Sequence, residues 1–207
     1  MSETNLFESK LELVRSHIRS FPDFPKKGIV FRDVCPILKN PAALAALTDL
    51  FEEHVRTSYQ QVDLIVGENL KGTTSVLMEH GVLMLPAVPP GLDARGFLFG
   101  PLLAQRLGLG FVLIRKKGKL PGSTTSVTFD LEYGQAEVEI QDDVVDPGQK
   151  VLIIDDLLAT GGTLCAAWEL LKQQQAEVLG CLVVIELLDL QGKNKVKPLP
   201  VFSLTHY

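Results

Sequence analysis

The sequence predicts an α/β fold built on a mainly parallel sheet, and three observations support this prediction. Short apolar runs alternate with stretches of helical periodicity along most of the chain. The run Val151–Ile154 is wholly apolar and rich in β-branched residues, which is typical of a central parallel strand. The chain has 207 residues, of which 46% are hydrophobic, enough for one globular domain with a sizeable core. We therefore expect residues 1–207 to form a single domain.

Local patterns place the individual elements. Apolar spacing predicts an amphipathic helix over residues 6–19, and Asn40 followed by Pro41 is typical of the start of a second helix. Residues 96–114 are expected to form a loop, a short helix and a strand. The other predicted elements are a helix at 163–175 and strands at 62–66, 126–131, 136–140, 151–154, 178–185 and 201–204. We expect the N-terminal arm and the antiparallel hairpin of residues 126–140 to lie outside the parallel sheet.

Composition excludes several classes of protein. A formal net charge of −5 argues against binding nucleic acid by charge alone. The three cysteines, Cys35, Cys165 and Cys181, are far apart and have no CxxC spacing, as expected for a reduced intracellular chain. The N-terminus lacks the pattern of a signal peptide, and the longest apolar stretch is broken by an arginine, glycines and a proline. We expect a cytoplasmic protein without a nucleic-acid or membrane partner.

The most informative segment is residues 151–163, where an apolar strand ends in two acids and opens into a loop of small residues before a helix. Ligands of open α/β sheets bind beyond the carboxyl ends of the strands, and a helix N-terminus offers free N–H groups to a phosphate. Asp155 and Asp156 are suited to accept hydrogen bonds from the two hydroxyls of a ribose. The segment predicts a ribose 5-phosphate site formed by these two acids and the loop residues Ala159, Thr160, Gly161, Gly162 and Thr163.

This segment closely resembles the phosphoribosyl pyrophosphate signature of type I phosphoribosyltransferases. Other blocks resemble the adenine phosphoribosyltransferases in particular, in the family's order: residues 18–25, 28–33, 92–101, 112–122 and 131–134. The resemblance implies a mostly parallel, twisted five-stranded sheet flanked by helices, a small hood at about residues 1–35 and a flexible β-hairpin catalytic loop. It also implies purine salvage by a homodimer that transfers ribose 5-phosphate from phosphoribosyl pyrophosphate to adenine and releases AMP and pyrophosphate.

By the same resemblance, cationic side chains bind the departing pyrophosphate, and Mg²⁺ accompanies it as a counter-ion. Arg95 lies in the segment that matches the family's pyrophosphate loop and is assigned to catalysis as well as to binding. The cluster Arg115, Lys116, Lys117 and Lys119 is a second basic patch. In the family this segment reaches the pyrophosphate partly across a dimer interface; Arg115, Lys116 and above all Lys119 are assigned to it. No metal ligand is assigned to the protein itself.

The resemblance also assigns the residues around the base. Phe31 is expected to form an aromatic wall for adenine, and Leu157 is expected to cover its other face. Backbone groups near Ile29, Val30 and Arg32 are expected to bind the edge of the base. Glu132 matches the family's general acid/base in a loop that closes over the reacting centre, and Tyr133 flanks it.

The chain departs from the family's pattern at about residues 68–91, which intervene between the strand at 62–66 and the pyrophosphate loop. Either residues 62–66 keep their strand and the insertion is extruded, or Val82–Leu85 replace that strand in the sheet. Two alternatives to an active adenine phosphoribosyltransferase are considered, and only the second depends on the insertion. One is a phosphoribosyltransferase for another base, although we find no motif for a lysine above a purine 6-oxygen. The other is a catalytically impaired variant that acts as a ligand-binding or regulatory subunit.

Overall fold

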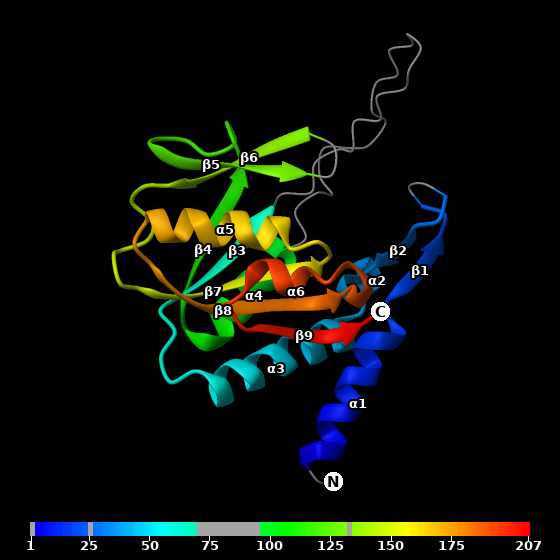
Figure 1. Ribbon diagram of the computed structural model, residues 1–207. Helices are drawn as coiled ribbons and strands as arrows, with labels where there is room; N and C mark the ends of the chain where they lie inside the picture. Colours follow the sequence, from blue (N-terminus) through cyan, green and yellow to red (C-terminus); the bar gives the residue numbers. More distant parts are fainter. Residues whose placement is uncertain (1–2, 25–26, 70–95, 132–133) are drawn as a thin grey trace.

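The computed structural model describes residues 3–24, 27–69, 96–131 and 134–207 (Figure 1). Its helices are α1 Glu3–Ser16, α2 Cys35–Lys39, α3 Pro41–Ser58, α4 Gly96–Leu107, α5 Gly162–Gln173 and α6 Gly192–Val196. Its strands are β1 Arg19–Pro22, β2 Val30–Asp33, β3 Leu64–Asn69, β4 Gly110–Lys116, β5 Thr124–Leu131, β6 Gly134–Gln141, β7 Lys150–Leu158, β8 Glu177–Glu186 and β9 Val201–His206. A short 3₁₀ turn, Leu188–Leu190, precedes α6.

The main sheet has seven strands in the order β5-β6-β4-β3-β7-β8-β9. Within this order, the strands β4, β3, β7, β8 and β9 run parallel to one another. This confirms the predicted mostly parallel α/β fold. The expectation that the β5–β6 hairpin lies outside the sheet was wrong, because β6 pairs with β4 in the antiparallel sense at Arg115–Glu139 and Lys116–Val138. This short ladder joins residues far apart in sequence, so local patterns do not reveal it. The hairpin therefore extends the sheet at its edge (Figure 1).

Helices cover both faces of the sheet (Figure 1). In β7, Leu152 and Ile154 pack into a core cluster with α1, α2, α3 and α4, whereas Val151 and Ile153 pack into a second cluster with α5 and α6. All four side chains are fully buried. This alternation explains why β7 is apolar at every position from 151 to 154, since both of its faces are covered.

The predicted start of α3 is confirmed in detail. The Asn40 side chain accepts hydrogen bonds from the backbone N–H groups of Ala42 at 2.9 Å and Ala43 at 3.1 Å, and Pro41 occupies the first turn. An N-cap of this kind stabilises a helix by about 1 kcal/mol. Neither α2 nor α6 was predicted, because each has only five residues.

The strand before the insertion keeps its place in the sheet. β3 pairs with β4 along its whole length and with β7 from Leu64 to Gly67. This position is therefore filled by the strand predicted at 62–66, now seen to extend to Asn69. Residues 82–85 lie outside the described residues.

The N-terminal arm lies outside the main sheet, as expected, and forms a two-stranded sheet that was not predicted. β1 and β2 pair in the antiparallel sense from Arg19–Asp33 to Pro22–Val30. The carboxylate of Asp33 anchors this arm, because it accepts hydrogen bonds from the Arg19 guanidinium at 2.5 Å and from the Cys35 N–H at 2.9 Å. In the described ranges, no helix combines the length and apolar character needed to cross a membrane.

Candidate functional site

The loop after β7 has the shape required of an anion-binding site. Gly161 is the N-cap of α5 and has a left-handed backbone, with φ of 79°, which strongly favours glycine. Among the described residues no side chain caps this helix start, and the N–H groups of its first turn are suited to bind a ligand. Gly162 and Thr163 are half-buried and Thr160 is exposed. The loop therefore presents backbone donors and hydroxyls at an accessible surface.

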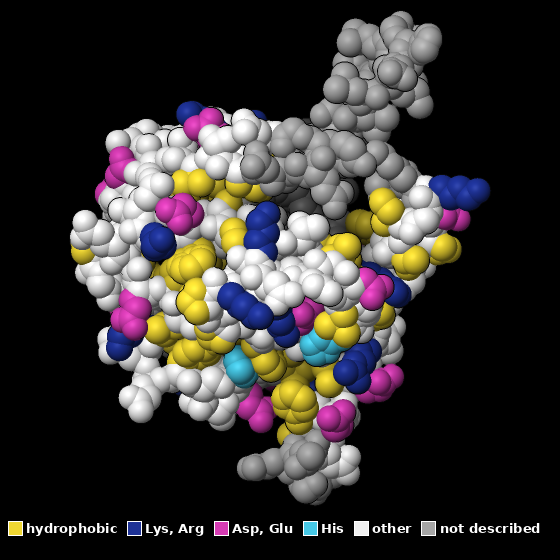
Figure 2. Space-filling model, viewed as in Figure 1, with side chains coloured by type: hydrophobic (Ala, Val, Ile, Leu, Met, Phe, Trp, Pro, Cys, Tyr) yellow, Lys and Arg dark blue, Asp and Glu magenta, His cyan; other side chains and the backbone are white. Residues whose placement is uncertain are grey.

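A second glycine supports this loop from behind. A Cβ atom at Gly161 would lie 2.6 Å from the carbonyl oxygen of Gly192, and a Cβ atom at Gly192 would lie 2.2 Å from the carbonyl oxygen of Ala159. The first residue of α6 is therefore in direct contact with the loop. The Cys165 thiol donates to the Lys195 carbonyl at 3.1 Å and ties α6 to α5 as well. Figure 2 shows Lys and Arg side chains gathered over α6.

Asp155 and Asp156 lie near the carboxyl end of β7, which continues through Leu157 and Leu158 to the loop. They are 5% and 1% exposed, respectively, which is unusual for acids and requires hydrogen-bond partners. The backbone N–H of Asp156 donates to the Asp155 carboxylate at 2.8 Å. The pair is therefore held within the sheet edge and is not part of a solvated acidic surface.

Parallel pairing brings the predicted segments to one edge of the sheet. β4, β3 and β7 are adjacent and parallel, so their carboxyl ends meet there. This places Arg115 and Lys116, at the end of β4, on the same edge of the sheet as the loop at residues 159–163, with β3 between them. The carboxyl end of β3 also lies at this edge.

The basic segment after β4 forms a turn at residues 117–120 that is held by hydrogen bonds. The Arg115 guanidinium donates from Nη1 to the carbonyl oxygen of Lys119 at 3.2 Å. Lys117 forms an ion pair with Glu137 on β6. In the part of the chain that the structure describes, Lys119 is exposed and forms no ion pair. Lys119 therefore has the charge that is most available to a ligand.

The hood presents an apolar surface. Ile29 and Val30 are 46% and 45% exposed, and the half-buried Phe31 ring packs edge-on against Phe24 with ring centroids 5.2 Å apart. Arg32 stacks on the ring of the C-terminal residue Tyr207, with its Cζ 3.9 Å from the centroid. The side chain of Leu157 in β7 is half-buried. Exposed apolar side chains on such a short arm are suited to contact a flat apolar ligand.

Comparison with known proteins identifies the family. The model of the phosphoribosyl transferase domain matches residues 90–205. The adenine phosphoribosyltransferases of Cricetulus griseus and Homo sapiens are 51% and 50% identical to the chain over 201 residues, which cover 97% of this chain and 98% of each relative. The chain belongs to the adenine phosphoribosyltransferase family.

Solved structures of this family have the same fold. The Saccharomyces cerevisiae adenine phosphoribosyltransferase, complexed with D-2,5-dideoxy-2,5-imino-altritol 1,6-bisphosphate and adenine, matches with a TM-score of 0.81 and 37% identity. That match covers 95% of this chain and 99% of the yeast chain. The Thermoanaerobacter pseudethanolicus enzyme matches with a TM-score of 0.80 and 38% identity. The type I phosphoribosyltransferase fold expected from the sequence is therefore confirmed.

The structure describes most, but not all, of the residues that the sequence assigns to an adenine phosphoribosyltransferase site. One sheet edge carries the predicted sugar-phosphate residues 155–163 and the basic residues Arg115, Lys116 and Lys119. The hood residues 29–32 lie at the start of β2. Arg95, Glu132 and Tyr133 lie outside the described residues. Two buried nitrogen atoms without a hydrogen-bond partner among the described residues are the Nε atoms of Arg32 and Arg115, both in predicted site residues.

Sequence reasoning missed three residues that support the family's site. Gly192 contacts the predicted phosphate loop at residues 159–163, Tyr207 stacks on Arg32, and the buried Glu139 binds the turn that carries Lys119. Each acts through a contact between segments that are distant in sequence. The one available signal was the spacing of Glu137 and Glu139, two acids on the same face of a predicted strand.

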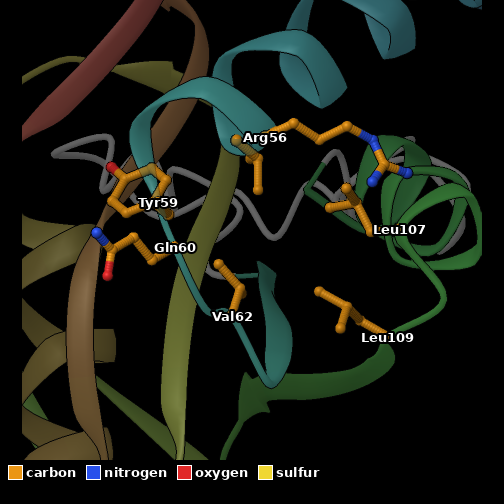
Figure 3. A pocket seen from close by; sticks show the side chains of 7 residues that line it. Arg56, Tyr59, Gln60, Val62, Leu107 and Leu109 are labelled. Atoms are coloured by element: carbon orange, nitrogen blue, oxygen red, sulfur yellow. The ribbon is translucent and has the colours of Figure 1, made fainter.

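The pocket in Figure 3 lies elsewhere. It is lined by Val55, Arg56, Tyr59, Gln60, Val62, Leu107 and Leu109. These residues come from the end of α3, the end of α4 and the segments that lead into β3 and β4. They mark the amino ends of those strands, whereas the phosphate loop follows the carboxyl end of β7. The pocket is therefore not part of the candidate site.

Proposed function

We propose that the chain acts in purine salvage as an adenine phosphoribosyltransferase, which transfers ribose 5-phosphate from phosphoribosyl pyrophosphate to adenine and gives AMP and pyrophosphate. The observation that carries the proposal is the loop after β7, with two buried acids before it and an uncapped helix start after it. Similarity to adenine phosphoribosyltransferases over 97% of the chain supports the choice of base.

The loop and the acids would hold the sugar phosphate. The 5-phosphate would accept hydrogen bonds from the N–H groups and hydroxyls of residues 159–163, where the positive end of α5 favours an anion. The carboxylates of Asp155 and Asp156 would accept hydrogen bonds from the ribose hydroxyls. These contacts fix the sugar so that its C1 carbon faces the base.

Lys119, Lys116, Arg115 and Arg95 would bind the pyrophosphate. Mg²⁺ would enter as part of the phosphoribosyl pyrophosphate substrate, held by phosphate oxygens. Within residues 3–24, 27–69, 96–131 and 134–207, no group of three or more His, Cys, Asp or Glu side chains could hold a metal ion. In this proposal the protein contributes to metal binding through the cationic side chains that hold the pyrophosphate.

The base would lie between Phe31 and Leu157, with backbone groups of Ile29, Val30 and Arg32 at its edge. In the transfer, a bond forms between a ring nitrogen of adenine and the C1 carbon of the ribose, and the bond from that carbon to the pyrophosphate oxygen breaks. The proton on the adenine ring must leave, and Glu132 is the group assigned to accept it, with Tyr133 beside it.

We also infer that the whole chain, residues 1–207, forms one cytoplasmic phosphoribosyltransferase domain that works as a homodimer. The dimer is supported by exposed apolar side chains on α4 and β4, where Leu98, Leu102 and Leu113 are each at least 37% exposed. The active enzyme is favoured over an impaired variant, because β3 occupies its place between β4 and β7 despite the insertion that follows it.

Initial rates of nucleotide formation with adenine, hypoxanthine and guanine test the proposal. The reaction contains phosphoribosyl pyrophosphate and Mg²⁺, and the chain is compared with a variant that lacks residues 68–91. We expect both proteins to form AMP and to use the other two bases at least 100-fold less efficiently. Activity only in the shortened variant would support the impaired-variant alternative, and no activity in either would overturn the proposal.

A further inference from the structure

Glu139 in β6 is a buried acid outside the residues assigned to the site. It is 3% exposed, although it lies on the hairpin at the edge of the sheet. Burial of a carboxylate is unfavourable unless several donors replace its water. The partners of Glu139 therefore indicate what the side chain does.

The groups that donate hydrogen bonds to the Glu139 carboxylate lie on or beside the basic turn at residues 117–120. Its Oε1 atom accepts hydrogen bonds from the backbone N–H of Lys119 at 2.8 Å and from that of Leu120 at 2.7 Å. Its Oε2 atom accepts a hydrogen bond from the Thr124 hydroxyl at 3.3 Å. Glu139 also lies directly across the β4–β6 ladder from Arg115.

Arg115 completes the support of the same backbone unit. Its guanidinium donates to the carbonyl oxygen of Lys119 at 3.2 Å, so a carboxylate holds the N–H of Lys119 and a guanidinium holds its C=O. The Lys119 side chain remains exposed. The backbone of this residue is thus fixed by two charged groups, while its ammonium is left free for a ligand.

Glu139 remains ionised at neutral pH. Burial by itself raises the pKa of its carboxyl, but hydrogen bonds from the backbone of Leu120, Gly118 and Lys119 and from Thr124 outweigh burial, and the pKa lies below its usual value. Because these donors occupy its oxygens, the Glu139 carboxylate stabilises the turn and does not face a negatively charged substrate.

We infer that Glu139 is a positioning residue for the transfer reaction, one that holds the turn at residues 117–120 so that Lys119 faces the pyrophosphate. This inference rests on the proposed function. Glu139 does not touch substrate; it acts through Lys119. Its loss is therefore expected to weaken the binding of phosphoribosyl pyrophosphate and to leave the binding of adenine unchanged.

Kinetics of Glu139→Gln test the inference, with Glu137→Gln as the matched control. Glu137 lies on the same strand and binds the Lys117 side chain and the Ser126 hydroxyl, but its carboxylate does not bind the backbone of the turn. We expect Glu139→Gln to raise the KM for phosphoribosyl pyrophosphate several-fold, up to the roughly 10-fold effect expected for loss of Lys119 itself, while kcat and the KM for adenine change less than twofold. Glu137→Gln should change none of these more than twofold.

A double-mutant cycle with Lys119→Met separates positioning from general damage. If Glu139 acts through Lys119, Glu139→Gln has no further effect on this KM in the Lys119→Met background. Equal multiplicative effects in both backgrounds, or parallel changes in both KM values, would overturn the inference. An active wild type with an unchanged Glu139→Gln variant also overturns it, whereas an inactive wild type overturns the proposed function instead.

Hydrogen exchange of the wild-type protein gives a test that does not depend on folding of a variant. The N–H groups of Lys119 and Leu120 are held by a buried carboxylate, so we expect them to exchange at least 100-fold more slowly than unprotected amides. Exchange at the rate of an open turn would show that the Glu139 contacts are not maintained, and would overturn the inference.

Discussion

Replacement of Gly192 by alanine has two opposite effects: helix propensity favours alanine, whereas steric contact with the phosphate loop at residues 159–163 disfavours it. Gly192 is the first residue of α6, where propensity alone favours alanine by up to about 1 kcal/mol. The added Cβ atom would lie 2.2 Å from the carbonyl oxygen of Ala159, 2.7 Å from Cδ1 of Leu158 and 3.0 Å from the backbone nitrogen of Gly161. Close carbon–oxygen contacts lie at about 3.3 Å, so α6 and the phosphate loop must separate by roughly 1 Å. The steric effect therefore prevails over propensity.

The expected cost follows from which atoms must move. Two of the three contacts are backbone atoms of the phosphate loop, so a side-chain rotation cannot relieve them. A misplacement of about 1 Å in a binding group can reduce the rate about 100-fold, or about 2.7 kcal/mol. We expect Gly192→Ala to lower kcat/KM for phosphoribosyl pyrophosphate by about this factor. The KM for adenine should change less than twofold, because the added Cβ atom meets residues 158, 159 and 161 and none of the hood residues 29–32.

Gly148→Ala serves as the control variant, because it is expected to lower stability without changing the candidate site. Gly148 lies in the turn before β7, has a φ of 82° and leaves open space for a Cβ atom, so alanine there costs about 1–2 kcal/mol of backbone strain. We expect it to lower the melting temperature and leave initial rates unchanged. The reasoning is refuted if Gly192→Ala retains wild-type kcat/KM, or if both variants lose activity in proportion to their loss of stability.

Three further predictions concern other parts of the site. Lys119→Ala should raise the KM for phosphoribosyl pyrophosphate about 10-fold in steady-state assays, whereas Lys117→Ala should have less than a twofold effect because Lys117 pairs with Glu137; equal effects would contradict this. Glu132→Gln should lower kcat by about 100-fold or more with little change in either KM, as expected for loss of a general base; an unchanged kcat would remove Glu132 from that role. For Asp33, burial raises the pKa but hydrogen bonds from Cys35 and Arg19 leave it below its usual 3.8. Its stabilising contribution is therefore present above pH 3.8 and is lost as pH falls through the lowered pKa. In urea unfolding, the difference between wild type and Asp33→Asn should shrink with acid below that value, and a pH-independent difference would contradict the assignment.

The sequence predicted those features of the fold that local patterns determine. Val151–Ile154 is apolar at every position because both faces of β7 are covered, and the Asn40 cap is a short-range hydrogen bond. The phosphate loop was predicted because its acids, glycines and helix start are contiguous. In each case the residues that determine the structure are neighbours in sequence.

The features that were missed depend on distant residues. The attachment of the β5–β6 hairpin to the sheet rests on two residue pairs between β4 and β6. The role of Glu139 rests on hydrogen bonds of 2.7–2.8 Å to another segment, and that of Gly192 on the absence of room for a Cβ atom, which would lie 2.2 Å from the carbonyl oxygen of Ala159. An acid in a strand is usually exposed, and a glycine at a helix start usually tolerates substitution. Neither residue type therefore indicates these contacts.

The most direct test of the central claim is to follow phosphoribosyl pyrophosphate, adenine and Mg²⁺ with the purified chain by ³¹P NMR. The account predicts that AMP and pyrophosphate appear in equal amounts as phosphoribosyl pyrophosphate disappears, and only when adenine is present. Loss of phosphoribosyl pyrophosphate without AMP, or no reaction by a folded protein, would contradict it.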